Sequence, residues 1–401
     1  MRAPAATAAS TALALVAAGW LAYAARPSIE VIRQNHTSSA KDLLPVYLGA
    51  HALAAGRDPN DPEALRATFG ELGVKAQVGG FFSYYPRTAS LLAQPLRAAP
   101  FRDVVQPVRA LLLASVIGAA IFGVLAGAAG APSEGRRSPA RVGIVAALAL
   151  AVAAAAVSLR ITMPIVRIAQ PGPLVALLAA VGLWALARGR DVTAGVAIAL
   201  GAGFKFAPAL LFVPALGARR WRAALAGGAV AALLALGMAY FHAFDAGDAA
   251  ARVADVGRFL FPPLAPSWEP PLVPLWRARV AVVPLTALLL LWAAWRRRPA
   301  AAAGAVALAG GAVVLAGTHM LHEAIHVVPV LGWVVGSALR PGAPRAAWIA
   351  PIALVGVGVV AGTVSVAGNA PSLAFVPLAT AAWLACAVRL VRGAEARRNV
   401  V

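Results

Sequence analysis

The chain consists mainly of long apolar stretches separated by short polar segments. A helix needs roughly 20 apolar residues to cross the hydrocarbon core of a membrane. Residues 192–217 are apolar but too short for two full crossings, so they indicate a tight helical hairpin around Gly201, Gly203 and Lys205. Counting both arms of this hairpin, we expect an all-α polytopic membrane protein with about 12 membrane helices, forming a single integral membrane domain over residues 1–401. The other predicted spans are 5–25, 104–130, 142–160, 171–187, 223–242, 279–294, 300–317, 327–339, 346–366 and 372–391.

The composition agrees with this fold class. Hydrophobic residues make up 61% of the chain and charged residues 12%, whereas an average soluble domain is about 45–50% apolar and about 25% charged. These values exclude a soluble globular protein, and a disordered chain would need low hydrophobicity. The single cysteine, Cys386, excludes an intrachain disulfide and a cysteine-based metal site.

The chain has a net charge of +20, and one set of short arginine-containing loops falls entirely on one side of the membrane in the twelve-crossing arrangement. The positive-inside rule makes that side cytoplasmic, so we expect both termini there and no nucleic acid as a partner. Twelve of the 15 acidic residues and all six histidines then lie outside or near the outer ends of spans. We therefore expect a multi-pass protein of the cell inner (plasma) membrane whose chemistry faces the extra-cytoplasmic side.

The first span, 5–25, is compatible with a signal peptide or with a retained anchor. Arg2 precedes it, and Ala-Tyr-Ala-Ala at 22–25 resembles a cleavage site. Because the apolar run is long for a signal peptide, we expect a retained anchor.

Two long segments are predicted outside the membrane. In the first, 26–103, we expect interfacial helices at 43–56, ended by Gly56, and at 88–98, with a turn between them at 57–62. The second, 243–278, is rich in proline, which forbids regular helix and suits a rigid loop over a cavity. No cytoplasmic loop exceeds about a dozen residues, so a cytosolic nucleotide domain has no place in this chain.

Asp42 follows the first span and precedes an apolar helical stretch. A carboxyl group buried in a cavity has a raised pKa and can serve as a general base. The same position also suits a plain helix cap. Both interpretations stay open on spacing alone.

Three cationic positions could contact an anionic substrate. Lys205 lies in the middle of the 192–217 hairpin, where a cation normally faces a polar cavity or snorkels to an interface. Arg160 and Arg167 bracket a short outer loop ending in Gln170-Pro171-Gly172. Guanidinium groups match phosphate oxygens, although charges in a solvated loop would show the same pattern.

The densest polar cluster is 318–326, where His322 and His326 share a helix face. Its His-Glu-x-x-His form is typical of zinc proteases, but no third ligand of the expected kind is evident. The pair could equally contact a phosphate or substrate, or be structural. We expect no metal.

The stretch from Asp42 to Pro59 resembles the opening signature of the family 87 glycosyltransferases. These are polytopic GT-C enzymes that include polyprenol-phosphate-mannose-dependent α-mannosyltransferases. The signature has an Asp, a Tyr five residues on (Tyr47), an Ala/Leu helix, and Gly-x-Asp-Pro, which begins here at Gly56. Further resemblances follow in order at Tyr85-Pro86-Arg87, at Gln170, at Lys205-Phe206-Ala207-Pro208 and at the late histidines His322 and His326. The sequence departs from the family pattern at Arg87, Asn60 and Gly172.

The resemblance implies an inverting, single-displacement transfer of a hexose from a polyprenyl-phosphate donor to a lipid or glycan acceptor, without a cofactor. By position, Asp42 would be the general base. The donor phosphate and substrates would be bound by Lys205, His322, His326, Arg160, Arg167, Gln170, Tyr47 and Tyr85.

Two alternatives belong to other classes. Twelve crossings with a broken hairpin also suit a transporter or lipid flippase, although the two halves of the chain show no convincing repeat. The histidine motif also suits an intramembrane metalloprotease.

Overall fold

The computed structural model describes residues 2–74, 85–129, 138–159, 161–205, 207–241, 272–316, 325–340, 347, 349–350 and 375–392. Every regular element in these ranges is a helix, and most are apolar along their length. The protein is therefore an all-α membrane protein, as the sequence predicts.

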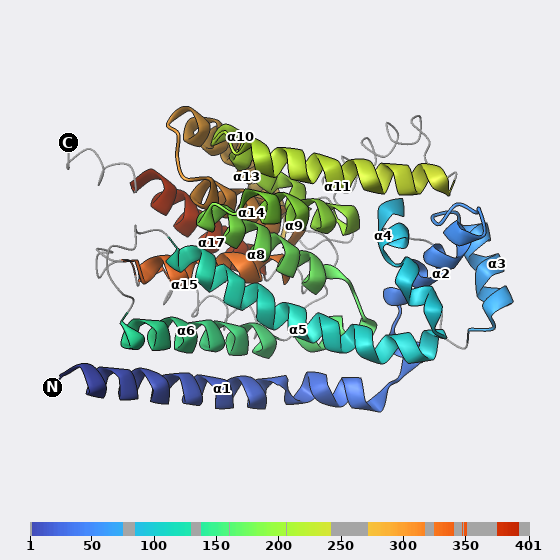
Figure 1. Ribbon diagram of the computed structural model, residues 1–401, viewed down its shortest axis with the longest axis horizontal. Helices are drawn as coiled ribbons and strands as arrows, with labels where there is room; N and C mark the ends of the chain where they lie inside the picture. The colour runs from blue at the N-terminus through green and yellow to red at the C-terminus, as the bar shows by residue number, and fades with distance from the viewer. Residues whose placement is uncertain are drawn as a thin grey trace.

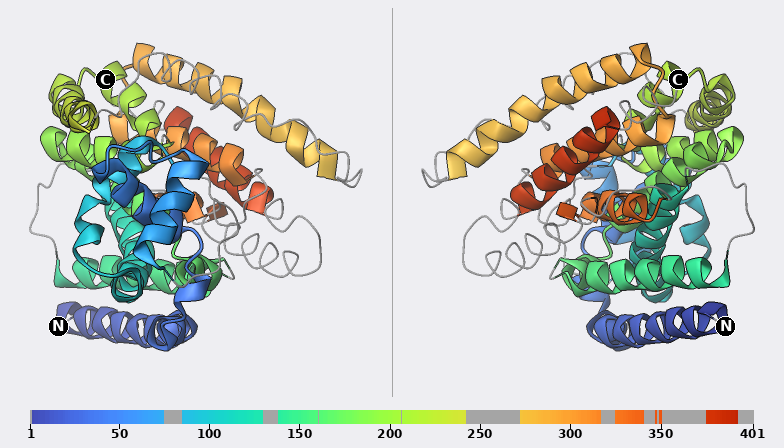
Figure 2. Two further views of the ribbon diagram at one scale, coloured as in Figure 1. Left: turned by 90° about the vertical axis from the view of Figure 1, so that its right-hand side faces the viewer. Right: turned by 90° about the vertical axis from the view of Figure 1, so that its left-hand side faces the viewer.

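One part of the bundle is built on α5 (Phe101–Ala128). Helices α6 (Pro139–Ser158), α8 (Gly172–Arg188) and α15 (Val328–Ala338) pack against α5, and α1 (Arg2–Gln34) covers α6 at the edge of the molecule (Figure 2). Glycines permit the closest approach: a Cβ at Gly123 or Gly127 would collide with the backbone of α15. Small residues at such contacts are typical of membrane helix packing.

The other part contains the predicted hairpin. Its first arm is α9 (Asp191–Phe204), and its second arm is η3 (Ala207–Leu211) followed by α10 (Phe212–Gly217). The chain breaks at Lys205, whose backbone is extended. Helix α11 (Trp221–Tyr240) packs on α9, while α13 (Leu272–Trp295), α14 (Ala300–Ala316) and α17 (Phe375–Arg392) complete this side.

Four helices in the described ranges are long and apolar enough to cross a membrane: α1, α5, α6 and α11. A fifth candidate is the pair of α7 (Thr162–Ile168) and α8, which bends by 116° at a short break. The other apolar helical segments that could be tested are 10–17 residues long, among them the part of α13 from Ala281 to Trp295, so the twelve crossings stay a prediction. The segment between Arg160 and Gln170, expected as a loop, contains helix α7, because Ile165 and Val166 are buried in the core.

The short helices of residues 37–98, which the sequence predicts to lie outside the membrane, gather at the end of the molecule opposite the start of α1 (Figure 1). They are η1 (Thr37–Ser39), α2 (Leu43–Ala54), α3 (Pro62–Leu72), α4 (Arg87–Leu92) and η2 (Gln94–Ala98). The predicted helix at 43–56 is confirmed as α2, and Gly56 follows it with a φ of +70°. The predicted helix at 88–98 is split into α4 and η2, because Pro95 cannot continue the helical hydrogen bonds.

Two further differences concern prolines. Helix α3 was not predicted, although Asp61 caps it by accepting from the amides of Glu63 and Ala64, and Pro62 fills its first position. Residues 243–271 of the proline-rich segment lie outside the described residues. Its last part, 272–278, was expected to be non-helical but belongs to α13, which begins at Leu272.

Candidate active site

Asp42 occupies the position just before α2 and is half-buried. Its side chain makes no capping hydrogen bond to the helix, so the cap interpretation gains no support. Its backbone amide donates to the carbonyl oxygen of Ile168 at 3.1 Å. This bond ties the carboxylate-bearing residue to the C-terminal end of α7.

The break between α7 and α8 is held by the side chain of Gln170. Gln170 is fully buried, and its Oε1 accepts from the amide of Gly172 at 2.8 Å. The preceding residue, Ala169, has a φ of +57°, a strained conformation for a residue with a Cβ. A Cβ on Gly172 would collide with Gln170 Oε1 and lie 3.3 Å from Ile325 Cγ2. Gly172 therefore lies close both to Gln170 and to Ile325, the residue that precedes His326.

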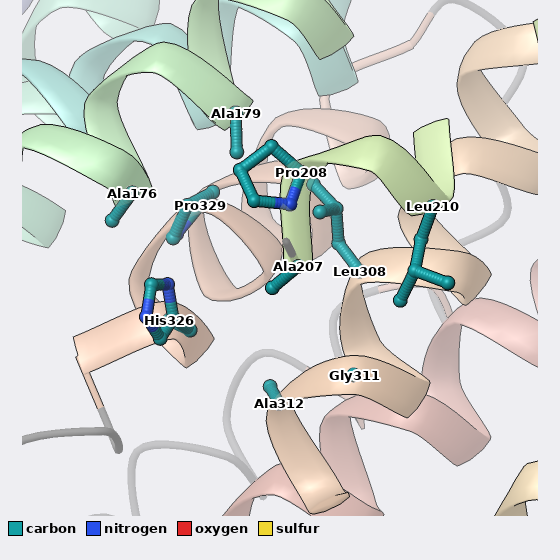
Figure 3. Close-up of a pocket in the computed structure, with 10 residues that line it drawn as sticks. All are labelled: Ala176, Ala179, Ala207, Pro208, Leu210, Leu308, Gly311, Ala312, His326 and Pro329. Atoms are coloured by element: carbon teal, nitrogen blue, oxygen red, sulfur yellow. The ribbon is translucent and has the colours of Figure 1, made fainter. Parts of the chain in front are cut away.

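His326 is nearly buried at the start of α15 and faces a small pocket (Figure 3). Apart from the imidazole the walls are apolar, and Figure 3 shows this ring near Ala176, Pro329 and Ala207. Elements α8, η3, α14 and α15 all contribute. The lining residues are Ala176, Ala179, Ala207, Pro208, Leu210, Leu308, Gly311, Ala312, His326 and Pro329.

The Lys205 ammonium group lies 5.6 Å from the centre of the Tyr85 ring. This distance fits a cation–π contact, which is strongest where water is excluded, and Tyr85 is buried. A hydrogen bond of 2.6 Å from Thr88 Oγ1 to the carbonyl of Gly203 fixes α4 against the end of α9. Lys205 is thus held between the broken hairpin and the segment that carries Tyr85 and α4.

Helix α2 connects Asp42 with this cation. Val46 and Ala50 follow Asp42 at intervals of four residues and therefore share its helix face, and both belong to the apolar cluster that contains Tyr85. Tyr47 lies on a different face, where its hydroxyl donates to the carbonyl of Ala99 at 3.0 Å and its ring packs on Phe101. Burial raises the pKa of Tyr47. In this structure Tyr47 anchors α2, while Tyr85 lies on the Asp42 side.

Two residues that depart from the family pattern stabilise the loops after α2 and before α4. Arg87 Nε donates to Asp58 Oδ1 at 3.0 Å, and the guanidinium forms an ion pair with this carboxylate. The amide of Asn60 also donates to Asp58 Oδ1, and Asn60 Nδ2 donates to the carbonyl of Tyr85 at 3.3 Å. Both residues therefore join the turn after α2 to the segment that carries Tyr85.

These contacts link the predicted site residues in a closed path. The hydrogen bond of Asp42 to Ile168 leads to the end of α7 and to Gln170. Gln170 and Ile325 both lie close to Gly172, and Ile325 precedes His326. The pocket connects His326 with η3, which follows Lys205, and the contact between Lys205 and Tyr85 leads back to the cluster on α2.

The other predicted site residues are not part of this path. Arg167 is exposed in the last turn of α7. Arg160 and His322 lie outside the described residues, as does Glu323 of the zinc-like motif. No group of three His, Cys, Asp or Glu within the described ranges could hold a metal ion.

Sequence analysis missed Arg109 at this site. Its side chain is fully buried in α5, and its Nη2 donates to the carbonyl of Arg167. The signal was present, because an ionisable residue within a membrane span is a functional candidate by default.

The sequence profile of glycosyltransferase family 87 matches residues 82–318, more than half of the chain. The chain belongs to glycosyltransferase family 87. It is therefore a membrane glycosyltransferase, an enzyme with a sugar donor and an acceptor, and this favours transfer over transport or proteolysis. The match includes Tyr85, Gln170 and Lys205, while Asp42 and His326 lie beyond its ends. No curated protein and no solved structure matches the chain.

Proposed function

We propose that this glycosyltransferase moves a hexose, with mannose as the first candidate, from a polyprenyl-phosphate donor to a lipid or glycan acceptor on the extra-cytoplasmic face of the inner membrane. The observation that carries the proposal is the closed path of contacts joining Asp42, Gln170, His326 and Lys205. These contacts connect the chain segments that carry one carboxylate, one ammonium group and one imidazole. These are the groups that a transfer from a phosphate ester requires.

The proposed reaction is a single displacement. The acceptor hydroxyl oxygen forms a bond to the anomeric carbon of the sugar, while the bond from that carbon to the phosphate oxygen breaks. The Asp42 carboxylate takes the hydroxyl proton. The polyprenyl phosphate leaves with the bonding electron pair, and its growing negative charge is stabilised by Lys205 and by hydrogen bonds from the histidine region. Attack opposite the leaving phosphate inverts the anomeric configuration.

The length of the predicted loops supports a lipid-linked donor. No predicted cytoplasmic loop exceeds about a dozen residues, which leaves no room for a nucleotide-binding domain. A polyprenyl monophosphate needs no such domain.

The test uses membranes that contain the full-length protein, a radiolabelled polyprenyl-phosphate mannose and a lipid extract as acceptor. Asp42→Asn keeps the shape of the side chain but cannot accept the proton, so we expect transfer to fall by about 10²–10⁴-fold. Asp103→Asn is the matched control, because Asp103 lies exposed in the first turn of α5 and should leave the rate unchanged. Full activity of Asp42→Asn would refute the base assignment, and absence of labelled product with wild-type membranes would refute the donor class.

A further inference from the structure

Arg109 places a positive charge in the interior of a membrane helix. It lies in α5, and its side chain is 0% exposed. A buried charge destabilises a fold unless hydrogen bonds compensate it. Its partners therefore indicate why a cation occupies this position.

Within the described part of the chain, the side-chain hydrogen bonds of Arg109 all lead to the segments that hold Asp42. Its Nη2 donates to the carbonyl of His36 at 2.9 Å and to Ser39 Oγ at 2.8 Å, both in the connector between α1 and α2. The same nitrogen donates to the carbonyl of Arg167 at 2.6 Å, in the last turn of α7. One guanidinium nitrogen thus joins the connector to α7.

The backbone amide of Asp42 binds the carbonyl that follows the one bound by Arg109 in α7. Its amide donates to Ile168, and Arg109 binds the carbonyl of Arg167, so two consecutive acceptors at the end of α7 are occupied. Ser39, three residues before Asp42, is held by the same guanidinium. The backbone of Asp42 is therefore fixed directly by α7 and indirectly by Arg109.

Stability alone does not account for this arrangement. Arg109 Nε and Nη1 are buried and make no hydrogen bond within the described part of the chain. Buried donors without acceptors are destabilising, and such costs are expected at functional sites rather than in an optimised core. The full burial of Arg109 also leaves no open surface at which it could contact a substrate.

We propose that Arg109 is a positioning residue: it sets the location of the Asp42 carboxylate by clamping the 36–39 connector to the end of α7. The inference rests on the proposed role of Asp42 as general base. A displacement of about 1 Å in a catalytic group can reduce a rate by about 10²-fold, so loosening this clamp should slow the chemical step without weakening the binding of the donor.

The first experiment measures the clamp without using activity. Hydrogen exchange of the purified full-length protein is compared between wild type, Arg109→Gln and the matched control Arg102→Gln, whose arginine is exposed on the same helix. We expect peptides covering residues 37–44 to exchange about tenfold faster in Arg109→Gln only, with α3 unchanged. Equal exchange in all three proteins would overturn the proposal.

The second experiment measures turnover with polyprenyl-phosphate mannose. For Arg109→Gln we expect kcat to fall by about 10²-fold while the donor KM stays within about twofold. Arg109→Lys keeps one donor and should recover part of the rate. Loss confined to KM would instead indicate a donor contact and overturn the positioning role.

Two further variants cover the remaining outcomes. If Arg109→Gln does not fold, Ser39→Ala removes one acceptor of the clamp and should show the same effects to a smaller extent; wild-type exchange and kcat in that variant would overturn the proposal. An active Asp42→Asn protein refutes the proposed function instead, and that result is separable because the exchange measurement does not depend on catalysis.

Discussion

Replacing Gly172 by alanine tests whether the Gln170 side chain holds the turn between α7 and α8. The added methyl group would collide with Gln170 Oε1 and would lie 3.3 Å from Ile325 Cγ2. Gln170 must then move away, and its 2.8 Å hydrogen bond from the Gly172 amide is lost. Leaving buried polar groups unpaired costs about 1–3 kcal/mol. For a chain of 401 residues, this corresponds to a decrease of about 1–4 °C in Tm, by scaling the unfolding entropy per residue.

The assay is thermal unfolding of the detergent-solubilised protein, combined with a double-mutant cycle. Gln170→Ala removes the atom with which the methyl group collides, so Gly172→Ala should cost clearly less in that background than in wild type. Gly70→Ala is the matched control, because a methyl group added to Gly70 in helix α3 would have no other atom within 4 Å, and we expect an unchanged or slightly raised Tm. Equal costs in both backgrounds would refute the clash with Gln170.

The remaining predictions concern two side-chain contacts. Lys205→Met should reduce kcat/KM for the donor by about 10–10³-fold, because the charge that stabilises the leaving phosphate is lost. Tyr85→Phe should leave most activity, because the ring that faces Lys205 is kept. A steady-state assay of both variants checks this, and a strong loss in Tyr85→Phe alone would contradict it. Burial and the charge of Arg97 lower the pKa of His51. As the pH falls below about 6.5, the pKa of a histidine in the unfolded chain, the unfolded protein therefore binds more protons at this position than the folded protein does. Stability should fall as the pH decreases below that value, and thermal unfolding of His51→Gln should show a weaker dependence on pH.

Local patterns carried enough information to predict several elements. The apolar run after Asp42 and the glycine at position 56 predict α2 and its end, because both depend on interactions within about one helical turn. The short apolar segment interrupted at Lys205 likewise predicts the broken hairpin. Helical spacing could have shown that Tyr47 points away from the Asp42 face, since Val46 and Ala50 share a face with Asp42 while Tyr47 does not.

Other features depend on contacts that no local pattern contains. Helix α7 is followed by Ala169 with a positive φ, and an alanine gives no sequence signal for that conformation. Tertiary packing decides this case. The predicted helix at 88–98 differs, because Pro95 is itself a local signal for the break, which the prediction did not use.

Arg109 shows most clearly why the site could be predicted only in part. Its hydrogen-bond acceptors are 73 and 58 residues away in sequence, and two of the three are backbone carbonyls, which any residue type supplies. A search for ion pairs therefore cannot find its partners, because the accepting atoms are two carbonyl oxygens and one hydroxyl group. The useful sequence signal is the energetic cost of burying the arginine. An arginine in an apolar span needs hydrogen-bond acceptors, and the chain segments that offer unpaired carbonyls are helix ends and connectors. Applied to α5, this reasoning directs attention to the end of α7 and the connector before α2, where Asp42 lies.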